Sequence, residues 1–117
     1  MQVIHFSADR MEPISLYDSV SAFGVPLGHG RGEAHVYCVH MDAGGRIGAH
    51  RAGFSQLFLV VAGSGWACGE DGRRADLAAG RGVYFARGET HAKGSDTGMT
   101  ALMVQVDDLA PAADALS

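Results

Sequence analysis

The sequence is poor in proline and cysteine, carries no excess of basic residues and has no long hydrophobic run. Its two cysteines, Cys38 and Cys68, are too few for a disulfide framework, so we expect both to be buried and reduced in a cytoplasmic protein. A net charge of −4 without a basic cluster excludes nucleic acid and an anionic membrane surface as partners. No apolar segment is long enough to span a membrane, and residues 1–7 lack the basic and apolar parts of a signal peptide.

Glycine, by contrast, is abundant. The 117 residues include 17 glycines, which indicates many tight turns between short elements. A hydrophobic fraction of 47% excludes a disordered chain, and the length suits one domain with a single core. We divide the chain into an irregular N-terminal arm that could serve as an interface strand (1–33), a folded barrel region (34–106) and a C-terminal tail (107–117).

Apolar segments alternate with glycine-based turns over residues 34–106. Gln56–Val61 is apolar on both faces, as in a strand with one face inside a barrel and the other covered. Gly63–Gly65 is predicted to turn the chain, and Asp71–Gly72 predicts a tight hairpin because both residues can adopt a positive φ. The segments predicted as strands are 34–41, 56–61, 66–69, 73–77, 83–86, a segment near His91, and 99–106. Strands of this length and spacing predict an all-β sandwich or barrel.

Two groups of regularly spaced residues carry the strongest signal. In the first group, His50 is followed by Ala52, Gln56 and Gly63, and Gly44 precedes them. This pattern resembles the first motif of the cupin superfamily, which has a glycine, five residues, His-x-His, three or four residues, a glutamate, six residues and a glycine. Ala52 stands at the second histidine position and Gln56 at the glutamate position, so two of the motif's ligand positions are altered.

The second group resembles the other cupin motif, a glycine, five residues, Pro-x-Gly, two residues, His, three residues and Asn. Gly80, Gly88 and His91 match it, while Ala86 replaces the proline and Ser95 the asparagine. The resemblance implies a double-stranded β-helix, or jelly-roll, barrel over residues 34–106. It also implies a homodimer formed through sheet edges or exchanged N-terminal strands.

A metal site is one interpretation of the altered motifs. The resemblance implies a ligand set of three histidines and a glutamate. This chain retains two of the histidines, His50 and His91, and has Gln56 at the glutamate position. Imidazole binds divalent zinc, iron, nickel, manganese or copper, whereas an amide oxygen is a weak neutral donor. Cys38 or His40, which share one face of the preceding strand, could complete the set.

A metal-free pocket for a small polar organic ligand is the alternative. Gln56 offers both a donor and an acceptor without the desolvation cost of a buried carboxylate. Phe58 and Val60 share its strand parity and would line the same cavity as His50 and His91. Further apolar lining could come from Tyr37, Phe85 and Met103. A third alternative is a purely structural barrel with a collapsed interior.

Two functions remain open from the sequence. The first is a small-molecule-binding cupin, and the second is a metal-dependent enzyme of the dioxygenase or sugar or keto-acid isomerase type. No catalytic residue is assigned. Glu89 is predicted to be a solvated turn carboxylate, with an acid/base role as the alternative. Arg87 and Lys93 are predicted to be ordinary surface charges, and Trp66 a packing residue.

Overall fold

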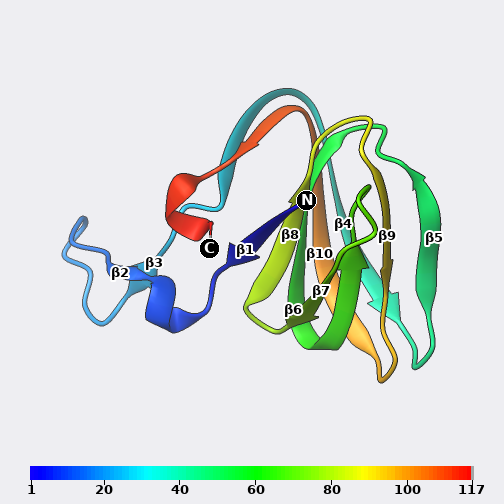
Figure 1. The fold of residues 1–117 in the computed structure, drawn as a ribbon. Helices are drawn as coiled ribbons and strands as arrows, with labels where there is room; N and C mark the ends of the chain where they lie inside the picture. The colour runs from blue at the N-terminus through cyan, green and yellow to red at the C-terminus, as the bar shows by residue number, and fades with distance from the viewer. Residues whose placement is uncertain (117) are drawn as a thin grey trace.

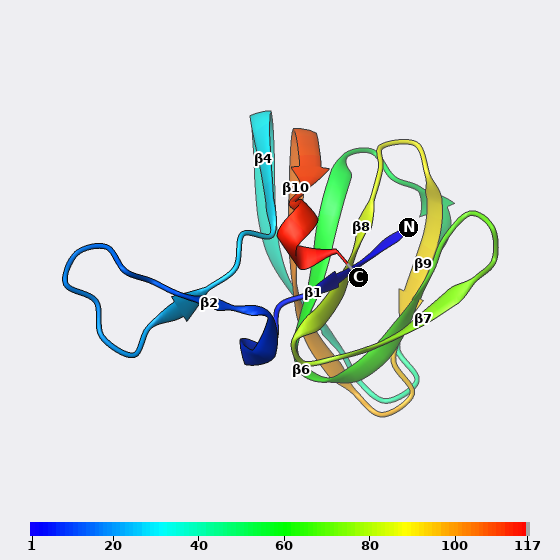
Figure 2. The ribbon, with the colours of Figure 1, turned by 60° about the vertical axis from the view of Figure 1, so that its left-hand side comes forward.

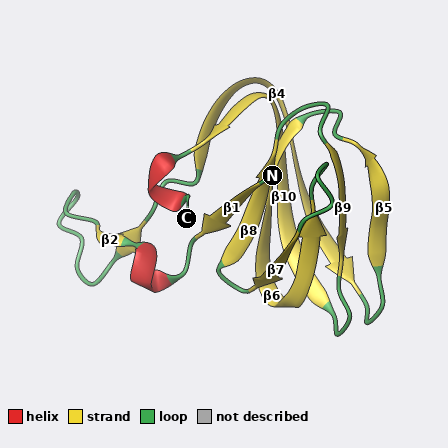
Figure 3. Ribbon diagram, viewed as in Figure 1, coloured by secondary structure: helices red, strands yellow, loops and turns green. Residues whose placement is uncertain are grey.

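The computed structural model describes residues 1–116, which form an antiparallel β-barrel with a projecting N-terminal arm (Figure 1). The strands are β1 (Gln2–His5), β2 (Glu12–Pro13), β3 (Phe23–Gly24), β4 (Gly28–Met41), β5 (Arg46–Arg51), β6 (Ser55–Cys68), β7 (Arg74–Ala78), β8 (Arg81–Phe85), β9 (Thr90–Gly94) and β10 (Met99–Pro111). Two short 3-10 helices, η1 (Ala8–Arg10) and η2 (Ala113–Ala115), complete the elements. The prediction of an all-β fold is confirmed (Figure 3). None of the helices in residues 1–116 has the length and apolar character needed to cross a bilayer.

The long strand β6 joins the two layers of the barrel. One layer has the strand order β1-β8-β6-β10-β4, with all neighbours antiparallel. The second half of β6 leaves this layer and pairs with β7 and β9, and β9 pairs with β5. The predicted hairpin after β6 is confirmed, since Cys68 lies opposite Arg74 and Gly72 has a φ of 79°.

The prediction of a turn at Gly63–Gly65 is wrong, because β6 runs through this segment and bends instead. Gly63 has a φ of 74°, and a Cβ atom there would lie 2.2 Å from the Gly98 carbonyl oxygen. A matching register shift occurs in β10 between Thr100 and Ala101. Glycine therefore allows one strand to bend and change layers, with a local irregularity in its pairing and no chain reversal.

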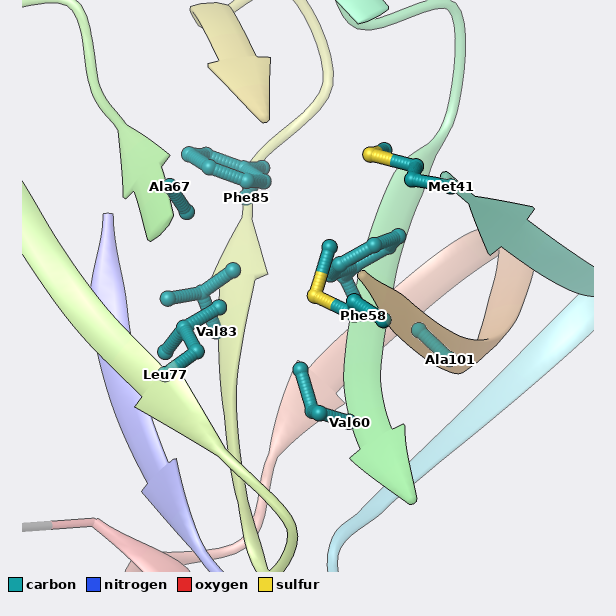
Figure 4. Packing of buried hydrophobic residues seen from close by; sticks show 9 residues of the cluster. Met41, Phe58, Val60, Ala67, Leu77, Val83, Phe85 and Ala101 are labelled. Carbon is teal, nitrogen blue, oxygen red and sulfur yellow. The ribbon is translucent and has the colours of Figure 1, made fainter. Parts of the chain in front are cut away.

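The barrel interior holds the larger apolar cluster (Figure 4). Its buried members are Met41, Phe58, Val60, Ala67, Leu77, Val83, Phe85, Met99 and Ala101. They come from strands of both layers, so their packing closes the barrel. Alternation along β6 sends Phe58 and Val60 into this cluster and Leu57 and Leu59 outward.

A second apolar cluster lies on the outer face of the first layer. Leu57 and Leu59 of β6 pack there with Ile4, Leu109 and Ala115, which come from the two ends of the chain. The N-terminal segment is thus partly regular, because β1 forms the edge of the layer beside β8. The predicted boundaries 33/34 and 106/107 fall inside β4 and β10, which pair up to Gly28 and Pro111.

The hairpin of β2 and β3 extends away from the barrel as a separate arm (Figure 2). Its large apolar side chains are exposed, and they are Ile14, Leu16, Tyr17, Val20 and Phe23. Exposed apolar residues also occur on β4 and β10, at Val36 and Leu102.

Candidate functional site at the mouth and floor of the barrel

The register of the first layer shows which side chains face the barrel interior. Paired residues of an antiparallel sheet point to the same face. One row consists of His35, Gln105, Gln56 and Phe85, and the next of Tyr37, Met103, Phe58 and Val83. Phe58, Val83 and Phe85 belong to the interior cluster, so both rows face inward. Tyr37, which remains 47% exposed, lies toward the open side of the barrel, whereas Phe58 is completely buried.

His50 and His91 come together on the second layer. They are paired residues of β5 and β9. A register shift in β5 between Ile47 and His50 puts both of these residues on the inner face, where Ile47 pairs with Lys93 and His50 with His91. The Nε2 atoms of the two histidines are 3.2 Å apart. His91 is buried with its ring edge-on to Phe85 at 4.4 Å between centroids, whereas His50 is exposed. We call the open side of the barrel at His50 its mouth, and the buried polar residues Lys93 and Gln56 with the ring of Phe58 its floor. The histidine pair lies between the two.

The hydrogen bonds assign a tautomer to each ring. The Nδ1 of His50 lies 2.8 Å from the Gly48 carbonyl oxygen, which can only accept, so His50 carries its proton on Nδ1. With the proton on Nδ1, the Nε2 of His50 presents a lone pair, and His91 donates its Nε2–H to it. This arrangement leaves the buried Nδ1 of His91 as an acceptor without a partner.

Lys93, the only lysine of the chain, lies on the floor of the barrel. The prediction that it is a surface charge is wrong, because the residue is only 1% exposed. Its Nζ donates a 2.6 Å hydrogen bond to Oε1 of Gln56 and contacts Sδ of Met103 at 3.7 Å. The same Nζ lies 4.8 Å from the ring centroid of Phe58. The sequence does hold a signal for this burial, because residues two apart on a strand share a face and Lys93 therefore shares the face of His91.

Burial governs the charge states of both inward residues of β9. Desolvation lowers the pKa of Lys93 from 10.5 to about 8, so the ammonium form still predominates at neutral pH. Desolvation, followed by repulsion from Lys93 and by repulsion from His50 when that ring is protonated, lowers the pKa of His91 from 6.5 to about 3. The floor therefore holds one cation, Lys93, next to a neutral imidazole.

Cys38 and His40 do not complete the site, contrary to one of the sequence-based alternatives. They alternate with the inward residues of β4 and lie on its outer face, where Cys38 pairs with Leu102 and His40 with Thr100. His40 contacts the Thr100 hydroxyl and the Asp42 carboxylate. Cys38 is exposed rather than buried, and Cys68 is half-buried, with both thiols free. Parity placed Cys38 and His40 on one face but could not say which face was inward.

Three other residues singled out from the sequence lie outside the floor. The side chain of Glu89 is only 15% exposed and bonds the Met1 amino group, so it is not a solvated turn carboxylate. Arg87 is half-exposed and pairs with Asp107, as expected of a surface charge. Trp66 packs against the backbone of Gly94, where an added Cβ would lie 2.4 Å from the indole.

The residues present do not fit a resident divalent metal ion. The 3.2 Å between the two imidazole Nε2 atoms is close to the roughly 3.4 Å expected of two nitrogens on one tetrahedral ion. However, the third predicted donor, Gln56, already accepts from the Lys93 ammonium. A metal-bound histidine normally donates its other ring N–H to an acceptor, and Nδ1 of His91 has none. Within residues 1–116, no three His, Cys, Asp or Glu side chains gather where they could hold an ion.

Comparison with known proteins gives a consistent picture of the fold. No family model and no curated protein matches the chain. A conserved protein of unknown function from Streptococcus pyogenes has a TM-score of 0.61 at 19% identity, with 66% of this chain and 67% of that chain covered. The DMSP lyase DddQ from Ruegeria pomeroyi has a TM-score of 0.59 at 24% identity, with 62% and 38% covered. A cupin-like protein from Thermotoga maritima has a TM-score of 0.60 at 20% identity, with 63% and 57% covered.

The chain spans well under two thirds of the lyase and of the cupin-like protein. Likeness at these identities concerns the fold and leaves chemistry to the residues of the site. The sheet order, the inward pair of motif histidines and these structural neighbours agree. The chain has the cupin fold, a double-stranded β-helix barrel.

Proposed function

We propose that this protein is a small-molecule-binding cupin whose ligand enters the mouth of the barrel and is held by His50, Gln56 and His91. The observation that carries the proposal is the polar path from solvent to the floor. It begins at the exposed ring of His50 and passes to His91 at 3.2 Å. Two residues further along the same face of β9 lies Lys93, which bonds Gln56. A buried charge reduces stability even when it is paired, and Nδ1 of His91 has no partner at all. A binding role would offset these costs, so a ligand is the explanation that we favour for this path.

The groups along this path suit a small ligand with polar atoms and a flat or apolar part. The imidazole of His50 can exchange its contact with His91 for one with the ligand, because neutral imidazole both donates and accepts. Gln56 offers an amide, and the exposed aromatic ring of Tyr37 lies on the inward face of β4 near the opening. Phe58 lies beneath Lys93 and shapes the floor.

The test is a calorimetric titration of untagged protein with a panel of small carboxylates, amides and polyols. We expect at least one class to bind, with affinity reduced tenfold or more in the His50→Ala variant. His40→Ala is the matched control, because His40 is also an exposed histidine but lies on the outer face. Equal affinity in the His50 and His40 variants, or the absence of binding across the panel, would contradict the proposal.

A metal-dependent enzyme of the dioxygenase or isomerase type is the second candidate. The observation in its favour is the spacing of the two imidazole nitrogens, 3.2 Å. The ammonium of Lys93 and the missing anionic donor oppose it. Elemental analysis of untagged protein, before and after incubation with zinc, iron, nickel, manganese and copper, tests this candidate. The metal-dependent enzyme requires stoichiometric metal in the wild-type protein and none in a His50→Ala/His91→Ala variant.

We also propose that the protein is a homodimer in the cytoplasm, with the arm of residues 12–24 laid on a second copy. The exposed apolar side chains of the arm, and those of Val36 and Leu102 on the outer face of β4 and β10, support this proposal. Light scattering should give twice the mass of one chain, and a Leu16→Ser/Val20→Ser variant should be monomeric. A monomeric wild-type protein would exclude the dimer.

A further inference from the structure

The ammonium of Lys93 lies on the floor of the barrel, where its direct oxygen partner is a neutral amide. The four ion pairs among residues 1–116 do not include Lys93. Its Nζ contacts Gln56 Oε1 and Met103 Sδ, and it lies 4.8 Å and 5.7 Å from the ring centroids of Phe58 and Phe85. Aromatic faces stabilise a cation but do not neutralise it. The barrel therefore contains an uncompensated positive charge.

We infer that Lys93 is the resident cation of this barrel, which takes the place of a metal ion and directs the site to a small organic carboxylate. The part of this inference that concerns the carboxylate rests on the proposed ligand-binding function. The part that concerns metal exclusion stands on the contacts of Lys93 alone.

One contact of Lys93 and its position on β9 explain why a divalent ion is excluded. Lys93 occupies the oxygen of Gln56, which is the remaining donor on the floor beside the two histidines. It also lies on the same strand face as His91, two residues away, so an ion at the histidine pair would be close to a like charge. The bond between Lys93 and Gln56 thus accounts for two features together, the exclusion of a metal ion and the amide that stands at the glutamate position of the motif.

The same contacts explain why a carboxylate suits the floor. A carboxylate accepts hydrogen bonds and supplies the negative charge that the floor lacks. The lysine side chain has a flexible four-carbon stem, so Nζ can turn from Gln56 toward a ligand that enters past His50. The N–H of His91 donates to His50 in this structure. When a carboxylate takes the place of the His50 ring, this N–H becomes a second donor to the ligand.

The metal arm of the test uses equilibrium dialysis of untagged protein against zinc chloride and nickel chloride. We expect weak binding by wild type and at least tenfold tighter binding by a Gln56→Glu/Lys93→Met variant, which restores a carboxylate donor and removes the ammonium. A second variant, Gln56→Glu/Lys93→Ala, guards against misfolding, and Arg46→Met is the control for loss of an exposed positive charge. Wild-type binding as tight as that of the double variants would overturn the inference.

The anion arm compares benzoate with benzamide, which differ in charge but not in shape. Wild type should bind benzoate at least tenfold more tightly than benzamide, and Lys93→Met should lose this preference while its circular dichroism stays unchanged. Equal binding of the two probes by wild type would overturn the carboxylate assignment but leave the proposed function intact. Failure of both probes and of the wider panel would refute the proposed function, whereas the metal arm would still test the role of Lys93.

Discussion

The two apolar clusters of the molecule share the strand β6, but only the interior cluster lies next to buried polar side chains. The outer cluster, with Leu57, Leu59 and Ile4, is closed by the two ends of the chain and consists of apolar side chains. The interior cluster adjoins Lys93 and Gln56, which are both almost completely buried, and its Phe58 and Phe85 rings lie next to the ammonium. A folding requirement alone explains the outer cluster. The interior accepts a desolvated charge, a cost to stability that points to a binding role.

The acid sensitivity of His91 gives the largest expected difference between the clusters. Its pKa is lowered to about 3 in the folded state from 6.5, so between these values the unfolded chain binds more protons. Stability contributed by neutral His91 is therefore complete above pH 6.5 and is lost as the pH falls to 3, by an amount on the order of 4 kcal/mol. Urea titrations at several pH values should show a steeper loss in wild type than in His91→Leu. Parallel curves would show that His91 is not buried in the neutral form.

Gln56→Leu should have the next largest effect. It removes the oxygen partner of Lys93 and leaves a buried ammonium without a hydrogen-bond acceptor, which should lower the free energy of unfolding by about 3 kcal/mol. Gln105→Leu is the matched control, because Gln105 is the neighbour of Gln56 in the same inward row but is half-buried. Equal effects of the two substitutions in urea denaturation would contradict the assigned bond between Lys93 and Gln56.

Leu57→Ala tests the outer cluster alone. The substitution removes buried apolar surface and leaves a cavity, so we expect a loss of about 2–3 kcal/mol in the free energy of unfolding. Ligand affinity, measured by calorimetry, should not change, because Leu57 faces away from the floor. Leu102→Ala, at an exposed position on the same face, serves as the control. It should lower the free energy of unfolding by only about 0.5 kcal/mol, the usual range for surface sites. A large change in affinity on Leu57→Ala would contradict the separation of the clusters.

The Gln56→Leu/Lys93→Met double variant should give the smallest effect and the opposite sign. It replaces both members of a buried polar pair by apolar groups, and such replacements are neutral or stabilising, here by about 1–2 kcal/mol. The same variant should lose carboxylate binding. A double-mutant cycle in urea measures the coupling, and strictly additive losses of stability would contradict a direct interaction between the two side chains.

Much of the fold and part of the site could be predicted from the sequence. The spacing of His50, His91 and the motif glycines predicted the barrel, and the pairing of the two histidines agrees with it. The glycines within residues 63–65 predict a turn, but glycine permits both a turn and a bend, and only the pairing partners decide between them. Parity grouped Cys38 with His40 but could not identify the inward face.

Lys93 was missed for a different reason. A lysine is ordinarily a surface residue, and that expectation outweighed its parity with His91 on a short strand. The burial of Lys93 depends on Gln56 and two aromatic rings from distant parts of the chain. Such a partnership follows from the tertiary structure and leaves no local pattern in the sequence.

The NMR spectrum of the protein labelled with ¹⁵N-lysine shows directly whether Lys93 is a buried ammonium that meets a carboxylate. Because Lys93 is the only lysine, its ammonium gives a single side-chain signal. Our account predicts a signal protected from exchange, displaced by the rings of Phe58 and Phe85, that shifts when benzoate is added and not when zinc chloride is added. A rapidly exchanging signal at the position of free lysine, unaffected by benzoate, would contradict the account.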